Sequence, residues 1–155
     1  MGQNCLLVTK ATMNDVNPIH QLISQYARQS LLLPRKKTYL YEHLRQYYVA
    51  KLNGQVIGVG ALRIFGFDIA EICSLAVVAE YRNQKIGSLI LERLEEEAKA
   101  LQLSKVFALT YQVEFFLKSG YHIVNKKQLS QKIWADCIHC PKYTDCDETA
   151  VIKEF

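Results

Sequence analysis

A polar loop between an apolar strand and a long helix is the part of this sequence best suited to binding an anion. The loop and the start of the helix run from Arg82 to Ser88, and Arg82 and Lys85 supply positive charge. Free N–H groups at a helix N-terminus point outward and the helix dipole is positive there, which favours a bound phosphate. An ordinary strand-to-helix turn explains the same residues, so local features alone leave phosphate binding open.

A single carboxylate lies within the apolar strand that precedes this loop. Glu71 is flanked by Ile69, Ala70 and Ile72. A carboxyl group in apolar surroundings tends to have a raised pKa, which suits a general base near neutral pH. A Glu that faces solvent on an alternating strand is the simpler explanation, and the residues alone favour it.

Three cysteines near the C-terminus have a spacing that could suit a metal. They are Cys137, Cys140 and Cys146, and His139 could complete a set of four ligands for zinc. The set lacks a second Cys-x-x-Cys motif and a His pair at the standard spacing. We therefore predict no metal site. Buried reduced thiols are the favoured interpretation, with structural zinc or a redox-sensitive pair as alternatives.

Length and composition predict one soluble globular domain. The chain has 155 residues, of which 50% are hydrophobic and 22% charged. No apolar run reaches the roughly 18 residues that a bilayer-spanning helix needs, and the first ten residues lack the pattern of a signal peptide. We therefore expect a cytoplasmic protein that does not bind membranes.

The charge is uneven along the chain. Residues 136–155 hold two lysines against five carboxylates, a net −3, whereas the whole chain carries +4. The remaining residues are therefore basic and favour an anionic ligand, although solubility explains the charge equally well. The Lys and Arg residues are scattered instead of forming a stripe, so we do not expect nucleic acid as a partner.

Hydrophobic periodicity predicts an α/β domain with one mixed, mostly antiparallel sheet flanked by helices, in the order β-α-α-β-β-β-α-β-α-β. Strands are expected at 5–12, 47–52, 55–65, 69–78, 105–109 and 121–124, with a further piece near 133–134, and helices start near Asp15, Thr38, Gly87 and Val113. Asn53-Gly54 predicts a tight hairpin. Residues 1–135 are expected to form the domain, and 136–155 an acidic, cysteine-containing tail packed on it.

The loop between Arg82 and Gly87 resembles a known cofactor-binding motif. Arg82-Asn83-Gln84-Lys85-Ile86-Gly87 is similar to the Gln/Arg-x-x-Gly-x-Gly/Ala loop of the GNAT acetyltransferases, whose element order matches the predicted one. The resemblance implies acetyl-CoA as cosubstrate. Its pyrophosphate would contact Arg82, Asn83, Gln84, Lys85, Ile86, Gly87 and Ser88, and its pantetheine arm Leu75, Ala76 and Val77. In one departure, Lys85 replaces the first Gly, and a Lys at positive φ is uncommon.

Further segments resemble the short, single-domain N-acetylglutamate synthases. These segments are Leu32–Arg35, Leu40–Arg45, Ala70–Val77, Val106–Tyr111 and Lys132–Pro141, followed by Cys146-Asp147-Glu148. The resemblance implies transfer of acetyl from acetyl-CoA to the α-amine of L-glutamate, the first step of arginine biosynthesis. Glutamine or another small amine is an alternative acceptor. A non-catalytic acyl-CoA-binding module is an alternative of another class.

The same resemblance implies roles for individual side chains. Glu71 would be the general base, and Thr110 the acid that protonates the CoA thiolate, with Tyr111 as the alternative acid. Arg35 and Lys132 would face the substrate, and an Arg can bind a carboxylate with two parallel hydrogen bonds. A solvated surface cation is the alternative for both, and for Lys132 this alternative is at least as well supported. A small amino acid substrate is thus the expected partner, and a homodimer is left open.

Overall fold

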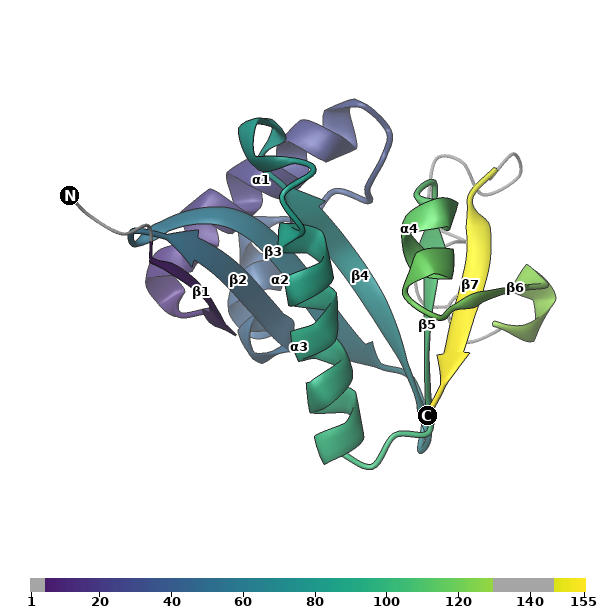
Figure 1. Cartoon of the computed structure of the whole chain (residues 1–155). Helices are drawn as coiled ribbons and strands as arrows, with labels where there is room; N and C mark the ends of the chain where they lie inside the picture. The colour runs from purple at the N-terminus through teal and green to yellow at the C-terminus, as the bar shows by residue number, and fades with distance from the viewer. Residues whose placement is uncertain (1–4, 130–146) are drawn as a thin grey trace. The chain divides into compact units, whose positions relative to one another are not determined.

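The computed structural model describes residues 5–129 and 147–155 of the chain. These residues form a seven-stranded sheet in the order β1-β2-β3-β4-β5-β7-β6, flanked by helices (Figure 1). The strands are β1 Leu6–Lys10, β2 Tyr47–Leu52, β3 Gln55–Ile64, β4 Ile69–Val77, β5 Lys105–Thr110, β6 His122–Val124 and β7 Thr149–Glu154. The helices are α1 Val16–Arg28, α2 Lys37–Glu42, α3 Ile86–Ala100 and α4 Val113–Lys118. Short 3-10 helices span Met13–Asp15, Leu44–Gln46, Ala79–Tyr81 and Lys126–Gln128.

Strand pairing confirms the predicted mixed, mostly antiparallel sheet. β1 pairs with β2, β2 with β3, β5 with β7 and β6 with β7, all antiparallel, whereas β4 and β5 are parallel. Asn53 and Gly54 have φ of 53° and 83° at the turn between β2 and β3. The predicted hairpin is therefore present, because both residue types tolerate positive φ.

The chain divides into two compact units. The first unit contains Met1–Leu62 and Ile72–Glu97, and the second contains Arg63–Glu71 and Ala98–Phe155. Strand β4 contributes to both, since the boundary falls between Glu71 and Ile72. Each unit has its own hydrophobic cluster.

In the first unit, the apolar face of α1 packs against the central strands. Its buried residues Val16, Ile19, Leu22 and Ile23 recur at helical spacing and join a cluster with Tyr47, Val49, Val59 and Ala61. Helix α3 lies on the opposite face of β3 (Figure 1). The period of two along a strand explains this division, because alternate residues of β3 face opposite sides.

Two glycines allow α3 to approach β3 closely. A Cβ atom at Gly60 would lie 2.7 Å from Ile90 Cγ2 and 3.0 Å from Leu94 Cδ1, and one at Gly58 would lie 2.8 Å from Ile90 Cδ1. A glycine inside a strand often marks a close approach of this kind. The contact positions the helix whose N-terminus follows the polar loop.

The second unit is organised around β5 and β7. Phe107, Leu129, Ala150 and Ile152 form its buried cluster. Strand β7 lies between β5 and β6 and pairs with both. The sequence predicts no strand in this segment, which was expected to be an acidic tail packed on the domain.

The start of helix α2 differs from the predicted one. Helix α2 begins at Lys37 with Lys36 as its N-cap residue, in place of the predicted Thr38 cap. Lys36 is extended, with φ −71° and ψ 154°, as is usual for an N-cap residue, and makes no side-chain capping hydrogen bond. The strand expected near Ile133 lies outside the described residues.

Within the described part of the chain, no helix has the length and apolar character needed to cross a membrane.

Candidate active site

The loop before α3 adopts an unusual backbone conformation. Asn83 and Lys85 both have φ of 65°, in the left-handed region. Lys85 thus takes the conformation for which glycine is favoured, at a cost of roughly 1–2 kcal/mol. Its carbonyl accepts the Leu89 N–H at 3.1 Å, which starts the helix. Because the first N–H groups of an α-helix have no partner within the helix, this end of α3 can donate hydrogen bonds to an anion.

Arg82 of this loop is held by Tyr26, a residue at a helical position of α1. The Tyr26 hydroxyl of α1 accepts hydrogen bonds from Arg82 Nε at 3.0 Å and Nη2 at 2.7 Å. The same hydroxyl donates to the Val77 carbonyl at 2.6 Å. The contact joins α1, the end of β4 and the loop, and the helical spacing of Tyr26 carries no signal of it.

Strand β4 is irregular in its centre. Ser74 has φ of 53° and is buried. A non-glycine residue in this region is strained, and such residues gather at ligand and active sites. The distortion directly precedes Leu75, Ala76 and Val77, the segment expected to meet pantetheine.

Arg35 lies in a group of side chains within the first unit. Its guanidinium carbon is 4.5 Å from the centre of the Tyr39 ring, in a cation–π arrangement. Burial is the main reason that the pKa of the Tyr47 phenol lies far above its usual range, and Cys73 and Tyr39 raise this pKa further. The Arg35 charge and a side-chain hydrogen bond with Ser74 lower the pKa of Tyr47. Arg35 is half-buried, so it is not a fully solvated surface cation.

Glu71 is buried, with only 3% of its surface exposed. It lies on β4 beside Phe107 of β5, in the parallel part of the sheet. This burial excludes the alternative of a solvent-facing Glu on an alternating strand. A buried carboxyl group needs polar partners, and such groups concentrate where chemistry is done.

The two candidate acids differ in how their hydroxyl groups are used. Thr110 is 9% exposed, and its Oγ1 accepts the backbone N–H of Gln112 at 2.8 Å. The half-buried Tyr111 donates its hydroxyl proton to Asp147 Oδ1 at 2.7 Å. A hydroxyl has one donor and two acceptor positions. The bond to Gln112 therefore leaves the Thr110 proton for another acceptor, whereas the Tyr111 proton is already directed to a carboxylate.

Comparison with known proteins identifies the family. Residues 13–121 match the model of the acetyltransferase (GNAT) family. The chain belongs to this family. An amino-acid acetyltransferase of Mycobacterium tuberculosis is 38% identical over 118 residues, which cover 74% of the chain and 67% of that protein. An uncharacterized N-acetyltransferase of Chlorobaculum tepidum is 39% identical over 146 residues, 94% of each chain.

Solved structures agree with the GNAT fold. A Mycobacterium tuberculosis protein crystallised with CoA has a TM-score of 0.81 and 29% identity, over 96% of this chain and 99% of that one. An N-acetylglutamate synthase of Neisseria gonorrhoeae, crystallised with coenzyme A and N-acetyl-glutamate, has a TM-score of 0.86 and 22% identity. The match covers 99% of this chain but only 36% of the Neisseria chain. Family, fold and enzyme class are therefore as the sequence predicted: this GNAT protein is an N-acetyltransferase.

Four of the residues singled out in the sequence lie beyond the described part of this GNAT chain. They are Lys132, Cys137, Cys140 and Cys146, and His139, the possible fourth zinc ligand, lies there as well. Within residues 5–129 and 147–155, no group of three or more His, Cys, Asp or Glu residues is arranged to hold a metal ion. Of the described cysteines, Cys5 and Cys73 take part in no disulfide.

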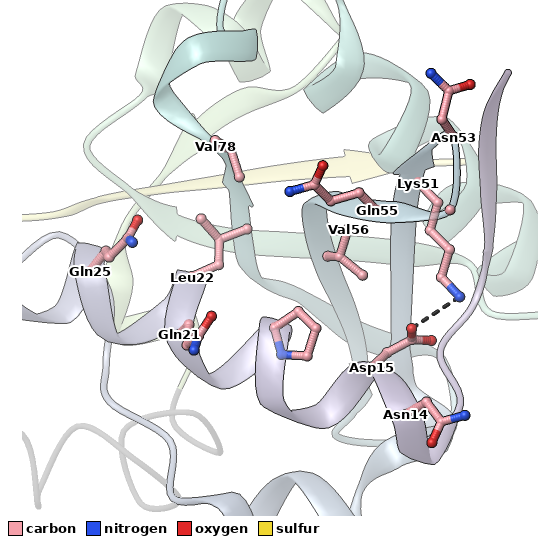
Figure 2. A pocket seen from close by; sticks show the side chains of 12 residues that line it. Asn14, Asp15, Gln21, Leu22, Gln25, Lys51, Asn53, Gln55, Val56 and Val78 are labelled. Atoms are coloured by element: carbon pink, nitrogen blue, oxygen red, sulfur yellow. Dashed lines mark ion pairs between the residues drawn. The ribbon is translucent and has the colours of Figure 1, made fainter. Parts of the chain in front are cut away.

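The first unit of this GNAT protein also contains a hollow of about 730 Å³ beside the start of α1 and the β2–β3 hairpin (Figure 2). Amide side chains such as Gln21 and Gln55 line it together with apolar residues such as Leu22 and Val56. Asp15 and Lys51 form an ion pair of 3.0 Å across it. None of the described residues predicted for catalysis, cofactor or substrate lines this hollow.

Proposed function

We propose that this GNAT protein transfers an acetyl group from acetyl-CoA to the α-amine of L-glutamate. The placement of Arg35 carries the choice of a carboxylate-bearing substrate. Its guanidinium is fixed over Tyr39, in the same unit as the distorted centre of β4 around Ser74. A guanidinium binds a carboxylate with two parallel hydrogen bonds, and glutamate offers two carboxylates.

Acetyl-CoA binding is supported by the loop before α3. Arg82 and Lys85 are exposed cations beside the first N–H groups of α3, which suits a diphosphate. Lys85 adopts the left-handed conformation that glycine takes easily, so the loop backbone here accepts a Lys. Coenzyme A is present in the two solved structures of similar proteins described above.

The proposed chemistry is direct transfer. Glu71 takes a proton from the substrate ammonium, and the resulting amine attacks the thioester carbonyl from about 3–3.5 Å. The C–N bond forms and the C–S bond breaks. Thr110 donates its hydroxyl proton to the departing thiolate and takes up the proton that the attacking nitrogen loses as the amide forms. The Thr110 oxygen is oriented by the Gln112 N–H. A backbone N–H near Leu75 or Ala76, after the distortion at Ser74, is the proposed donor to the oxyanion.

An amine panel tests the acceptor. Purified protein with acetyl-CoA should release free thiol when L-glutamate is added, and mass spectrometry should detect N-acetyl-glutamate. Arg35→Ala should raise the KM for glutamate, with Arg35→Lys intermediate because it keeps the charge without the fork. Release with glutamine or another amine, but none with glutamate, would replace the acceptor. CoA binding without turnover of any amine would favour the non-catalytic module.

Substitution of the candidate base and acid tests the chemistry. Glu71→Gln should bind acetyl-CoA normally and lose about 10²–10⁴ in kcat, the usual contribution of a general base. Thr110→Ala should lose at least about 10² in kcat, Thr110→Ser should retain most of the rate, and Tyr111→Phe should lose little. Full activity in Thr110→Ala together with a large loss in Tyr111→Phe would exchange the roles of the two hydroxyls.

A further inference from the structure

We infer that Tyr26 is a positioning residue that orders Arg82 to receive a phosphate of the cofactor. The inference rests on the proposed use of the loop before α3 to bind acetyl-CoA. Tyr26, Val77 and Arg82 all belong to the first unit, so their contacts lie within one compact body.

The hydrogen bonds of Tyr26 define how Arg82 is held. Its hydroxyl donates to the Val77 carbonyl at 2.6 Å and accepts from Arg82 Nε at 3.0 Å and Nη2 at 2.7 Å. One donor and two acceptor positions are the full capacity of a hydroxyl. Because the carbonyl of β4 takes the phenol proton, both oxygen lone pairs are turned toward the guanidinium.

Arg82 keeps donors for a ligand while it is held in this way. A guanidinium has five N–H groups, and two of them point to Tyr26. The side chain is exposed and belongs to the loop that also contains the left-handed Asn83 and Lys85. The remaining N–H groups suit a phosphate, for which guanidinium has matching geometry.

Tyr26 is suited to this task because it is itself well anchored. It is half-buried against the hydrophobic cluster of the first unit, on the last turns of α1. The Arg82 guanidinium also lies 5.2 Å from the centre of the Tyr26 ring. An unrestrained Arg loses considerable rotamer entropy when it binds a ligand. Holding Arg82 before the ligand arrives lowers that cost, as preorganisation does in other binding sites.

The experiment compares two acetyl donors in wild type and Tyr26→Phe. Acetyl-CoA contains the diphosphate, whereas acetyl-pantetheine has the same thioester without it. Tyr26→Phe should raise the Kd for CoA, measured by calorimetry, and the KM for acetyl-CoA by about tenfold, since a hydrogen bond to a charged group is lost. The kcat, and the KM for acetyl-pantetheine, should not change. Tyr41→Phe, at an exposed tyrosine of α2, is the matched control and should leave all values unchanged.

A double mutant separates positioning of Arg82 from a purely structural role. Arg82→Ala should weaken CoA binding, and Tyr26→Phe should weaken it no further in that background. Equal losses with both acetyl donors would overturn the inference, as would additive effects in the double mutant. Tighter CoA binding by Tyr26→Phe would also overturn the inference, because it would mean that Tyr26 competes with the phosphate for Arg82. Wild-type protein that binds no CoA would refute the cofactor assignment, and this inference with it, whereas normal binding by Tyr26→Phe refutes only the role of Tyr26.

Discussion

Burial determines the protonation of individual side chains in the first unit. Tyr47 is 1% exposed, and burial raises the pKa of its phenol far above the usual value of about 10. The phenol is therefore neutral at physiological pH and acts as a hydrogen-bonding group beside Ser74. The opposing effect of Arg35 on this pKa shows that the guanidinium is close enough to influence the same cluster.

The raised pKa of Tyr47 predicts a loss of stability in alkali. The folded-state pKa exceeds that of the unfolded chain, so this contribution to the free energy of unfolding is complete below about pH 10. It falls as the pH rises further, because the unfolded state ionises first. Urea denaturation from about pH 8 to pH 11 should show the fall, and Tyr47→Phe should make it shallower.

A second tyrosine, Tyr48, should contribute to the same loss of stability in alkali. Burial also raises the pKa of Tyr48, with a hydrogen bond to Glu97 as the next cause, so part of the slope should persist in Tyr47→Phe. The exposed Tyr41 supplies the matched variant, and Tyr41→Phe should retain the wild-type slope. An unchanged slope in Tyr47→Phe would show that Tyr47 does not ionise with a raised pKa.

At the scale of elements, the distance between α3 and β3 determines where the loop before α3 is held. A Cβ at Gly60 would meet Ile90 Cγ2 at 2.7 Å, an atom fixed close to the helix backbone. One at Gly58 would instead meet Ile90 Cδ1 at 2.8 Å, the far end of the same side chain. The stiffness of a β-branched residue at its first side-chain torsion makes the first contact harder to relieve.

We therefore expect Gly60→Ala to destabilise the protein by about 1–3 kcal/mol, the usual cost of overpacking. Gly58→Ala should cost about 1 kcal/mol or less, because the Ile90 terminus can move and the substitution reduces the entropy of the unfolded chain. Urea denaturation of both variants measures the difference. Equal stabilities, or a larger loss in Gly58→Ala, would contradict the packing described for Gly60.

At the scale of the whole molecule, the chain does not finish one unit before it begins the other. It passes between them after Leu62, Glu71 and Glu97. The second unit is completed only by β7, which pairs with β5 from Thr110↔Thr149 to Lys105↔Glu154 and also with β6. Integrity of β5, which carries Thr110, therefore depends on residues at the far end of the chain.

A chain that stops after Glu148 should lose the cooperative fold of its second unit. Both ladders of β7 would be absent, and Ala150 and Ile152 would leave the cluster with Phe107. Hydrogen exchange should show loss of amide protection in β5 and β6. Removal of Phe155 alone is the control, since it costs one backbone hydrogen bond to Ser104 at 2.9 Å and the Lys99 contact with a ring that is 42% exposed. Protected β5 amides in the longer truncation would refute the dependence on β7.

The sequence predicted most helices and strands and drew attention to the loop that begins at Arg82. Periodicity located α1 and α3, Asn53-Gly54 predicted the hairpin, and the motif beginning at Arg82 led to the correct family. Strand β7 was missed because its flanking residues are acidic and its partner β5 is about forty residues earlier in the chain. A short strand that depends on long-range pairing leaves only a weak local pattern.

For the candidate site, too, some features could be predicted from the sequence and others only from the tertiary structure. Residue types and spacing drew attention to Glu71 and Arg82, because carboxyl and guanidinium groups have recognisable chemistry wherever they occur. The resemblance to the acetyltransferases was needed to favour Glu71 as the base and to add Thr110 and Tyr111 as candidate acids. Tertiary structure alone established that Glu71 is buried, that the Tyr111 proton is directed to Asp147, and that Tyr26 holds Arg82. Helix periodicity and turn preference act between near neighbours and can be read along the chain. Burial and hydrogen-bond partners arise between residues dozens of positions apart, so they exist only after the chain has folded.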